Sequence, residues 1–427
     1  MSPDAPNGAS GGRARVLVLA GAHSYRLQPF QAAADRLDVE VVHGLDTPPA
    51  HTGAGQTVLR LDFRDAGRSA RQVLAYAKAR PFKAVIPTDD ATVILAAHLA
   101  AALGLRHNSP AAAEAARDKH LMRRVLAQAG LRTPWFQLFS TGASPSGAAT
   151  QVRYPCVLKP TCLSGSRGVI RADSPTEFVT TFTRLQAMLA PLAATDILVE
   201  GYIPGREFAL EGLLSDGNLQ VLALFDKPDP LEGPYFEETI YVTPSRENAE
   251  TQADIARCVA EAARALGLRE GAVHGEVRVN AQGPWLIEVA GRSIGGLCGQ
   301  TLRFAHSATV SLEELILRQA LGWELDGLER EPTPGGVMML PIPSAGVLTG
   351  WDGVEATRAV PGIESVEITA RLNYPLVPLP EGESYLGFIF ARAATPADVE
   401  AALRAAHRCL HFQIEPALSM AGQPVSS

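Results

Sequence analysis

The first hundred residues alternate between short apolar runs and segments with helical spacing. Four runs are almost continuously apolar, which is typical of strands buried on both faces of a parallel sheet. These runs span 16–21, 39–43, 58–62 and 84–87. The segments between or after them have helical spacing and span 27–37, 66–80 and 91–104. The alternation predicts a small open α/β domain with a largely parallel sheet.

Beyond residue 116 the pattern becomes mixed α+β. An amphipathic helix is predicted over 118–130, and Ser174-Pro-Thr-Glu177 is a capping box that begins another over 175–189. Further strands are predicted at 197–200, 208–214, 219–225 and 274–290. The Pro/Gly segment 332–336 marks a boundary. A β-rich region follows it, with strands at 337–343, 364–370 and 386–392.

The segment 274–290 predicts a β-hairpin with one apolar and one polar face. The apolar face is formed by Val277, Val279, Trp285, Ile287 and Val289. The polar face carries His274, Glu276, Arg278, Asn280 and Glu288. A turn centred on Gln282 would pair 280 with 284, 278 with 286, and 276 with 288.

In that register Glu276 and Glu288 face each other, with Cβ atoms roughly 4.5–5.5 Å apart, which is repulsive without a cation. Hard oxygen ligands suit Mg²⁺ shared with phosphates, so the pair is interpreted as a metal site. Two alternatives are that one Glu is solvated at the strand end, or that Arg278 neutralises both carboxylates. The hairpin alone leaves them open.

A loop rich in glycine and hydroxyl groups follows the predicted strand that carries Lys159. It contains Ser164, Gly165, Ser166 and Gly168. Backbone N–H groups of such a loop close on phosphate oxygens, and a lysine adds a point charge. The loop lacks the Gly-Lys-Ser/Thr helix start of a Walker A motif. Taken alone, an ordinary turn is the simpler interpretation.

Composition narrows the class of protein. A chain of 427 residues is too long for one core. Its net charge of −7, without a basic run, argues against nucleic-acid binding. The five cysteines show no CxxC spacing and the N-terminus has no apolar leader, so we expect a cytoplasmic protein with reduced thiols. The longest apolar stretch, 92–105, is too short to span a membrane and predicts a buried helix.

Five motifs in order resemble those of the ATP-grasp superfamily, and the match covers about residues 85–325. They are Thr88-Asp-Asp90, Ala116-Arg-Asp-Lys119, Val157-Leu-Lys-Pro160, 197–203 and Trp285-Leu-Ile-Glu-Val-Ala-Gly-Arg292. Each motif is weak alone, but five in this order are a strong signal. The resemblance implies an α/β and α+β protein: a small parallel domain, a two-lobed ATP-grasp domain and a β-rich C-terminal lid subdomain. The expected bounds are a disordered tail at 1–14, then 15–115, 116–330 (lobes 116–200 and 201–330), 331–418, and a tail at 419–427.

The resemblance also implies how ATP and Mg²⁺ would be bound, with Mn²⁺ as a possible substitute. Lys119 and Lys159 match lysines that contact phosphates and nucleotide. Ser164, Gly165 and Ser166 match the mobile loop that closes over the phosphates. Backbone groups in the segment Glu200, Gly201, Tyr202 and Ile203 would hold adenine, and Glu207 would accept the ribose hydroxyls. Glu276 and Glu288 match the metal ligands.

The amino-acid ligase branch of this superfamily gives the best match. Most superfamily members have Asn two residues after the second metal ligand, whereas this chain has Ala290, which puts a second Mg²⁺ in doubt. The motif Glu288-Val-Ala-Gly-Arg292 is similar to the pattern of the branch. Arg292 would then face the reacting phosphate or carboxylate. Glu238 matches an acidic residue near the amino substrate, and Tyr241 stands where some relatives have His.

The resemblance implies an ATP-dependent carboxylate–amine ligase acting through an acyl phosphate. The substrates it implies are small carboxylates and amines, namely amino acids, and it implies a homodimer. The alternatives are a carboxylase-type ligase and a non-catalytic nucleotide-binding regulator. Gly295 and Gly296 suggest backbone close to substrate, and the missing side chain at Gly296 would leave room for a larger one; a plain flexible loop is the alternative. For His274 a structural role is the simpler interpretation.

Overall fold

The computed structural model describes residues 13–21, 24–47, 57–192, 196–305, 310–382 and 384–416. Apart from its last two residues, the tail predicted at 1–14 lies outside these ranges, and so does the tail predicted at 419–427. Within the described ranges, no helix is both long and apolar enough to cross a membrane. The longest apolar stretch forms the largely buried helix α3 (Val93–Ala102), as predicted.

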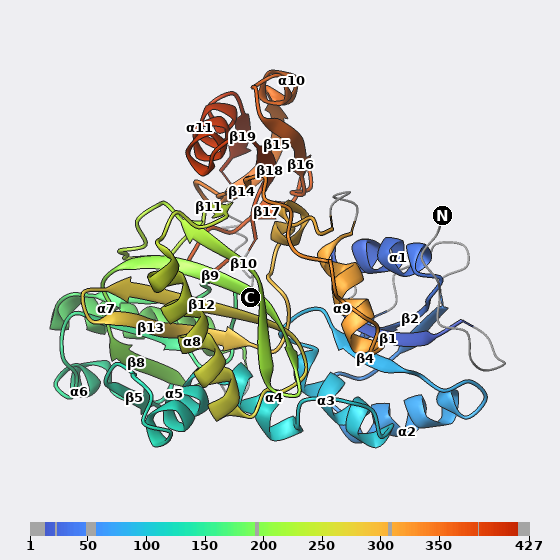
Figure 1. The fold of residues 1–427 in the computed structure, drawn as a ribbon. Coiled ribbons are helices and arrows are strands. Elements are labelled where there is room, and N and C mark those ends of the chain that lie inside the picture. The colour runs from blue at the N-terminus through green and yellow to red at the C-terminus, as the bar shows by residue number, and fades with distance from the viewer. Residues whose placement is uncertain are drawn as a thin grey trace, which may run out of the picture.

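A four-stranded parallel sheet forms the N-terminal domain, which confirms the predicted α/β arrangement (Figure 1, blue). In spatial order its strands are β3 (Thr57–Arg60), β2 (Glu40–Leu45), β1 (Arg15–Ala20) and β4 (Ala84–Pro87). Helix α1 (Leu27–Arg36) packs on one face, and α2 (Ala66–Ala77) and α3 pack on the other. The order of the strands changes direction between β1 and β4, and ligands bind at the carboxyl ends of strands at such points.

Two short helices lead from this domain to the next lobe. They are α4 (Pro110–Arg117) and α5 (Lys119–Gln128). The Asp118 side chain accepts a hydrogen bond from the backbone N–H of Leu121 and so caps α5. The cap fixes the start of the helix and therefore the position of Lys119, its first residue.

A small lobe follows, with an antiparallel sheet and a hydrophobic core of its own. Its strands, in spatial order, are β5 (Phe136–Phe139), β8 (Ile197–Gly201), β6 (Cys156–Pro160) and β7 (Ile170–Ala172). Helices α6 (Pro145–Ala149) and α7 (Pro175–Leu189) cover it. The N-terminus of α7 is capped by Ser174, as the capping box predicted. All residues of the lobe's core cluster come from the lobe itself, so it is a separate packing unit.

An eight-stranded antiparallel sheet joins the large lobe to the C-terminal region. Its spatial order is β13 (Gly283–Ala290), β12 (Gly271–Asn280), β9 (Arg206–Ser215), β10 (Asn218–Lys227), β11 (Ile240–Thr243), β14 (Gly335–Leu340), β18 (Gly387–Arg392) and β16 (Ile363–Ile368). Strands β11 and β14 pair directly, so the sheet continues across the predicted boundary near residue 331. The C-terminal region is therefore built partly on the same sheet as the large lobe.

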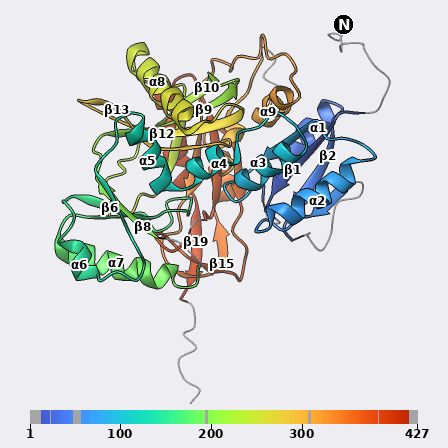
Figure 2. The same cartoon turned by 90° about the horizontal axis from the view of Figure 1, so that it is seen from below.

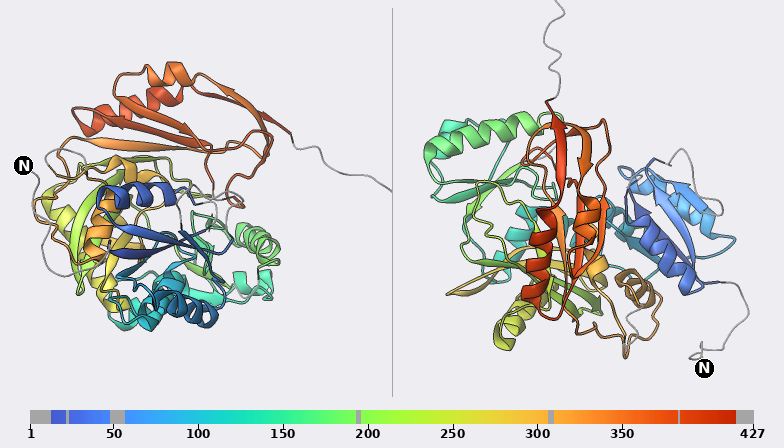
Figure 3. Two further views of the ribbon diagram at one scale, coloured as in Figure 1. Left: turned by 90° about the vertical axis from the view of Figure 1, so that its right-hand side faces the viewer. Right: turned by 90° about the horizontal axis from the view of Figure 1, so that it is seen from above.

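The remaining elements cover this sheet and extend it. They are α8 (Ala249–Leu266), η1 (Cys298–Thr301), α9 (Leu312–Ala320), α10 (Val354–Arg358), α11 (Pro396–His407) and a small sheet of β17 (Pro375–Leu376), β15 (Gly346–Asp352) and β19 (His411–Glu415). One core cluster includes Phe30 of the N-terminal domain, Phe225 of the large lobe and Phe388 of the C-terminal region. Figures 2 and 3 show these parts arranged around a common centre.

The β12–β13 hairpin differs from the predicted register. Its turn has two residues, so Asn280 pairs with Gly283 and Arg278 with Trp285; the predicted pairs 280–284 and 278–286 are wrong. A bulge then inserts Ile287 into β13, and the predicted pairing of Glu276 with Glu288 is confirmed.

The bulge also changes which side chains of β13 are buried. Leu286 and Val289 lie in the core, whereas Trp285 and Ile287 are only half-buried. The predicted apolar face is therefore wrong for Trp285 and Ile287.

Candidate functional site

One cavity of about 1010 Å³ lies among the N-terminal domain, the two lobes and the C-terminal region. Every site residue predicted from the sequence lines it: Lys119, Lys159, Ser164, Gly165, Ser166, Glu200, Gly201, Tyr202, Ile203, Glu207, Glu238, Tyr241, Glu276, Glu288, Arg292, Gly295 and Gly296. The fold thus brings together segments separated by up to 177 residues. Their individual roles stay predictions.

The two hairpin carboxylates are largely shielded from solvent and each faces a lysine. Glu276 Oε1 lies 3.3 Å from Lys227 Nζ, and Glu288 Oε2 lies 3.5 Å from Lys119 Nζ. Their side chains are 16% and 26% exposed, which excludes a fully solvated carboxylate. Arg278 does not neutralise them, because its guanidinium binds Glu207 at 2.7 Å. The alternative in which Arg278 neutralises both carboxylates is therefore wrong, and the metal site stays a prediction.

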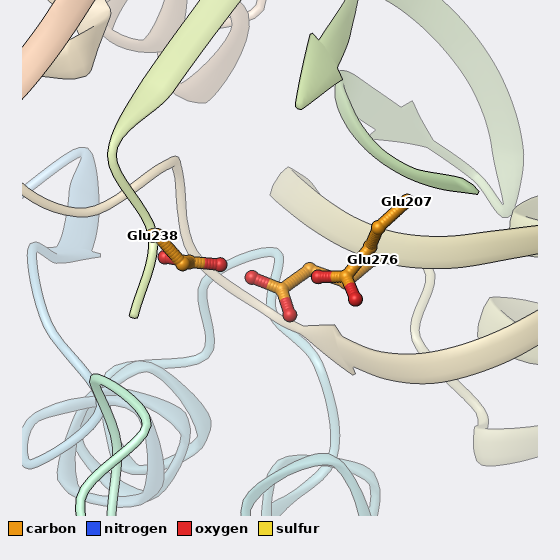
Figure 4. Close-up of side chains that lie close together, drawn as sticks. All are labelled: Glu207, Glu238 and Glu276. Atoms are coloured by element: carbon orange, nitrogen blue, oxygen red, sulfur yellow. The ribbon is translucent and has the colours of Figure 1, made fainter. Parts of the chain in front are cut away.

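Lys227 at the end of β10 is a site residue that the sequence analysis missed. Its buried ammonium contacts Glu207 at 2.8 Å and Glu276 at 3.3 Å, and also contacts Glu238. The three carboxylates converge, with one oxygen of each within 4.8 Å of the others (Figure 4). They hold the pKa of Lys227 well above its usual value, although burial opposes the shift. The sequence signal was weak: Lys227 and Asp226 are two charged residues that follow the apolar run ending at Phe225.

The pKa of Glu238 is also raised, but for a carboxyl group this favours the neutral form, whereas for Lys227 it favours the charged form. Burial raises its pKa to about 7, and the neighbouring Glu276 and Glu207 carboxylates add to this, while Lys227 lowers it. Tyr241 lies beside this group, with Lys227 Nζ 5.0 Å from the centre of its ring. A buried carboxyl with a pKa near neutrality can exchange a proton with a bound group.

His274 belongs to a buried network behind Glu276. Its Nδ1 lies 3.2 Å from Glu211 Oε2, and its Nε2 lies 3.5 Å from Glu276 Oε1. These carboxylates raise its pKa to about 9, although burial lowers it. Glu211 also accepts a hydrogen bond from the backbone N–H of Ile294 at 2.9 Å. The network links the hairpin to the glycine-containing segment after Arg292, and it supports the structural role expected for His274.

Lys159 and Glu200 form a buried cluster with Arg123 of α5. Arg123 Nε lies 2.8 Å from Glu200 Oε2, and Lys159 contacts the other carboxylate oxygen. Arg123 also donates to the carbonyl of the bulge residue Ile287 at 2.7 Å. Burial lowers the pKa of Lys159, which Glu200 partly offsets. The Glu200 side chain therefore balances two cations, and only its backbone remains for a nucleotide.

Aromatic rings line the cavity next to this segment. Tyr202 stacks with Phe236 at 6.5 Å, and the Arg171 guanidinium lies 4.1 Å from the centre of the Tyr202 ring. Such flat apolar surfaces suit a planar base. Glu207 binds both Lys227 and Arg278, so a ribose would have to share its oxygens with these cations.

The loop after Lys159 contains three residues in the left-handed backbone region. Gly165, Ser166 and Gly168 have φ values of 62°, 55° and 71°. A Cβ on Gly168 would lie 2.8 Å from the ring of Pro160, so only glycine fits there. The Lys119 ammonium donates to the Leu163 carbonyl at 2.6 Å and anchors the start of the loop.

Arg292 is held by the N-terminal domain. Its Nη2 lies 2.7 Å from Asp90 Oδ2, and Asp90 raises the pKa of the guanidinium against the effect of burial. This contact explains why the Thr88-Asp-Asp90 motif lies at the site: it follows β4, at the point where the strand order changes direction.

The two glycines after Arg292 differ. Gly296 has a φ of 58°, and a Cβ there would lie 3.1 Å from Phe388. The prediction that Gly296 leaves room for substrate is therefore wrong: the backbone requires glycine, and Phe388 fills the space. At Gly295, by contrast, a Cβ would meet no atom within 4 Å. The open wall of the cavity is at Gly295.

The donor set fits a divalent cation. Glu276 and Glu288 are cross-strand partners, and Glu276 also belongs to the converging group with Glu207 and Glu238, of which Glu288 is not a member. All four residues offer carboxylate oxygens, the ligands that Mg²⁺ and Mn²⁺ prefer. Position 290 is alanine and adds no ligand. Lysines, an arginine and a glycine loop with left-handed residues surround the same cavity, so the residues also fit a polyphosphate.

Two family models match the chain. Residues 152–301 match the ATP-grasp domain, and residues 338–415 match the L-amino acid ligase C-terminal domain 2. A solved L-amino acid ligase from Bacillus licheniformis is 26% identical, with a TM-score of 0.79 over 95% of this chain and 100% of that chain.

The curated relatives match over part of their length. Alanine–anticapsin ligase of Bacillus subtilis is 30% identical over 213 residues, which are 45% of this chain and 44% of that protein. An uncharacterised protein of Sinorhizobium fredii is 26% identical over 310 residues, covering 72% of this chain and 63% of its own length. The chain thus spans less than two thirds of the length of either relative.

Proposed function

We propose that the chain is an ATP-dependent carboxylate–amine ligase. The matches of residues 152–301 to the ATP-grasp domain and of residues 338–415 to the L-amino acid ligase C-terminal domain support this proposal. The reaction would join a carboxylate and an amine, both amino acids or their derivatives, into an amide and release ADP and phosphate. One observation carries the proposal: all the predicted site residues line one cavity, and among them Lys119, Lys159 and Arg292 supply positive charge for phosphates.

The proposed reaction has two steps. The substrate carboxylate attacks the γ-phosphorus of ATP, which gives an acyl phosphate and ADP. The amine then attacks the acyl carbon, the phosphate leaves, and the amine loses a proton. The protein's contribution is positioning and charge neutralisation, as in other phosphoryl transfers.

The first step requires groups that balance the charge of ATP. We assign the phosphates to Lys119, Lys159 and the loop at Ser164, Gly165 and Ser166. Glu276 and Glu288 would hold Mg²⁺, which supplies Lewis-acid stabilisation of phosphate oxygens when bound. The backbone of 200–203 would bind adenine, and Glu207 the ribose hydroxyls.

The second step requires a bound amine and a dry site. Arg292 has the planar fork that grips a carboxylate or phosphate, and Asp90 fixes its direction. Glu238 would hold the amine beside Tyr241 and, with its pKa raised to about 7 by burial, would take its proton. The C-terminal residues Tyr385 and Phe388 wall the cavity and would exclude water from the acyl phosphate.

The experiment is a screen of amino-acid pairs for ADP and phosphate release, with mass spectrometry of the products. We expect amide formation that requires Mg²⁺. If ADP and phosphate are released with bicarbonate and an acceptor, but not with amino acids, a carboxylase-type ligase would be favoured. Nucleotide binding without turnover across all pools would favour a regulator. We also expect a cytoplasmic protein that forms a homodimer. Light scattering of the purified protein would test its oligomeric state.

A further inference from the structure

A turn of the C-terminal region lies directly against the loop at residues 164–168, to which we assign the phosphates and which we call the phosphate loop. The Pro380 carbonyl accepts a hydrogen bond from the backbone N–H of Gly168 at 2.8 Å, and the Glu381 carbonyl accepts one from Arg167 Nε at 2.9 Å. The turn is tight, because a Cβ on Gly382 would lie 1.8 Å from the Val377 carbonyl oxygen. We call residues 377–382 the clasp turn. Its contacts with the phosphate loop bring together two segments that are more than 200 residues apart in the sequence.

A side-chain ion pair fastens the clasp turn to the small lobe. The Glu381 carboxylate receives two hydrogen bonds from Arg184 of α7, from Nε at 2.6 Å and from Nη2 at 2.8 Å. Arg184 Nη1 also contacts the Tyr235 hydroxyl at 2.5 Å. This two-point geometry is the strongest arrangement for an arginine and a carboxylate. The side chains are 41% and 39% exposed, so water screens the pair and its effect on affinity is moderate.

The clasp turn lies where it can control closure of the cavity. The phosphate loop, at Ser164 to Arg167, lines part of the cavity. The C-terminal region lines another part of it, through Thr369 to Arg371 and Tyr385. The core cluster of the small lobe draws only on the lobe itself. A lobe with its own core, joined to the rest through polar contacts, moves as a unit relative to its neighbours.

We propose that Arg184 and Glu381 are positioning residues that fasten the phosphate loop to the C-terminal wall of the cavity. The nucleotide side and the amino-substrate side of the site then close together. Neither residue lines the cavity, so both act through the loop and the clasp turn. The proposal rests on the proposed function only in taking a nucleotide as the ligand of the loop.

Reciprocal coupling follows from this arrangement. A nucleotide that orders the loop favours the position of the C-terminal wall, and a ligand held by that wall favours the loop by the same factor. A half-exposed ion pair accounts for about a three- to fivefold change in affinity. Glu381→Gln removes the charge but leaves the Pro380 and Glu381 carbonyls in place, so it isolates the ion pair from the main-chain contacts.

The test uses the full-length protein with ADP and Mg²⁺, which bind without turnover. Calorimetry gives the ADP dissociation constant, and hydrogen exchange of the peptide containing Gly168 reports its contact with Pro380. Glu381→Gln and Arg184→Gln should each weaken ADP binding about three- to fivefold and speed exchange of this peptide. In steady-state assays of the ligase reaction, KM for ATP should rise by the same factor, with kcat changed less than KM.

Two further variants make the result specific. The charge swap Arg184→Glu with Glu381→Arg should restore both the dissociation constant and the protection, because it restores the ion pair. The Tyr235 hydroxyl, which accepts from Arg184 in the wild type, would then donate to the carboxylate at position 184. Asp254→Asn removes an exposed ion pair of α8, with Arg257 at 3.0 Å, and should change neither, because neither residue lines the cavity.

The outcomes separate this proposal from the proposed function. Wild-type protein that binds no ADP would overturn the proposed function. Wild-type binding with unchanged single variants, or a charge swap without recovery, would overturn the role of the ion pair alone.

Discussion

Replacing Glu200 with Gln removes the one negative charge from a buried cluster of two cations. The carboxylate, 4% exposed, binds Arg123 at 2.8 Å and contacts Lys159. Burial alone would raise the pKa of Glu200, but Arg123 and Lys159 outweigh it and lower the pKa from 4.5 to about 2. The charged form is thus favoured in the folded protein, and its removal should destabilise the fold.

The magnitude follows from this pKa. A change from 4.5 to about 2 corresponds to roughly 3 kcal/mol at 1.36 kcal/mol per pH unit. Removing one partner of a buried ion pair costs about 3–5 kcal/mol in other proteins, which agrees. Because the folded pKa is depressed, the stabilisation is complete above pH 4.5 and is lost as the pH falls from there toward 2.

The assay is urea denaturation of wild type and Glu200→Gln, followed by circular dichroism at pH 7 and pH 3.5. We expect the variant to lose about 3 kcal/mol at pH 7 and about 2 kcal/mol at pH 3.5. Glu355→Gln is the control, since Glu355 forms an exposed pair with Arg358 and should change stability by less than about 0.5 kcal/mol. A loss below about 1 kcal/mol at pH 7, or one that grows on acidification, would refute this reasoning.

Further substitutions test the site. Glu288→Gln should lower kcat by at least about 100-fold in the amide-forming assay while the melting temperature stays near that of wild type; wild-type turnover would count against the metal site. Lys227→Met removes the cation that Glu207, Glu238 and Glu276 share and should cost about 3 kcal/mol or more by denaturation, and a neutral result would show that the acids are protonated. Gly295→Leu should narrow the range of accepted substrates in the pair screen without loss of stability. Gly296→Ala, by contrast, should destabilise the protein by about 1 kcal/mol or more, because the φ of Gly296 is left-handed. The reverse pattern would contradict the assignment of the open wall of the cavity to Gly295.

Elements with a strong local signal could be predicted from the sequence. The β1 strand is continuously apolar because neighbours on both sides and both faces bury it. Asp118 and Ser174 mark helix starts because a short polar side chain satisfies a backbone N–H left free there. These signals depend on a few adjacent residues, so a single sequence contains them.

The partners of the site residues could not be predicted in the same way. Arg123 and Glu200 are 77 residues apart, and Arg292 and Asp90 are 202 apart. Nothing in the spacing of the chain says which of its 38 Lys and Arg residues meets which acid. Motif order located the site, but the ion pairs that orient its side chains depend on how the lobes pack.

The confirmed pairing of Glu276 with Glu288 shows how a correct prediction can depend on an irregularity that the sequence does not reveal. With a two-residue turn and ideal pairing, Glu276 would face Ile287, and Glu288 would point to the other side of the sheet, since side chains alternate between faces. The inserted Ile287 returns Glu288 to the face of Glu276, and Arg123 holds the bulge through the Ile287 carbonyl. Glu200 in turn anchors Arg123. The geometry of the proposed metal site therefore rests on the same buried cluster that the Glu200→Gln experiment perturbs.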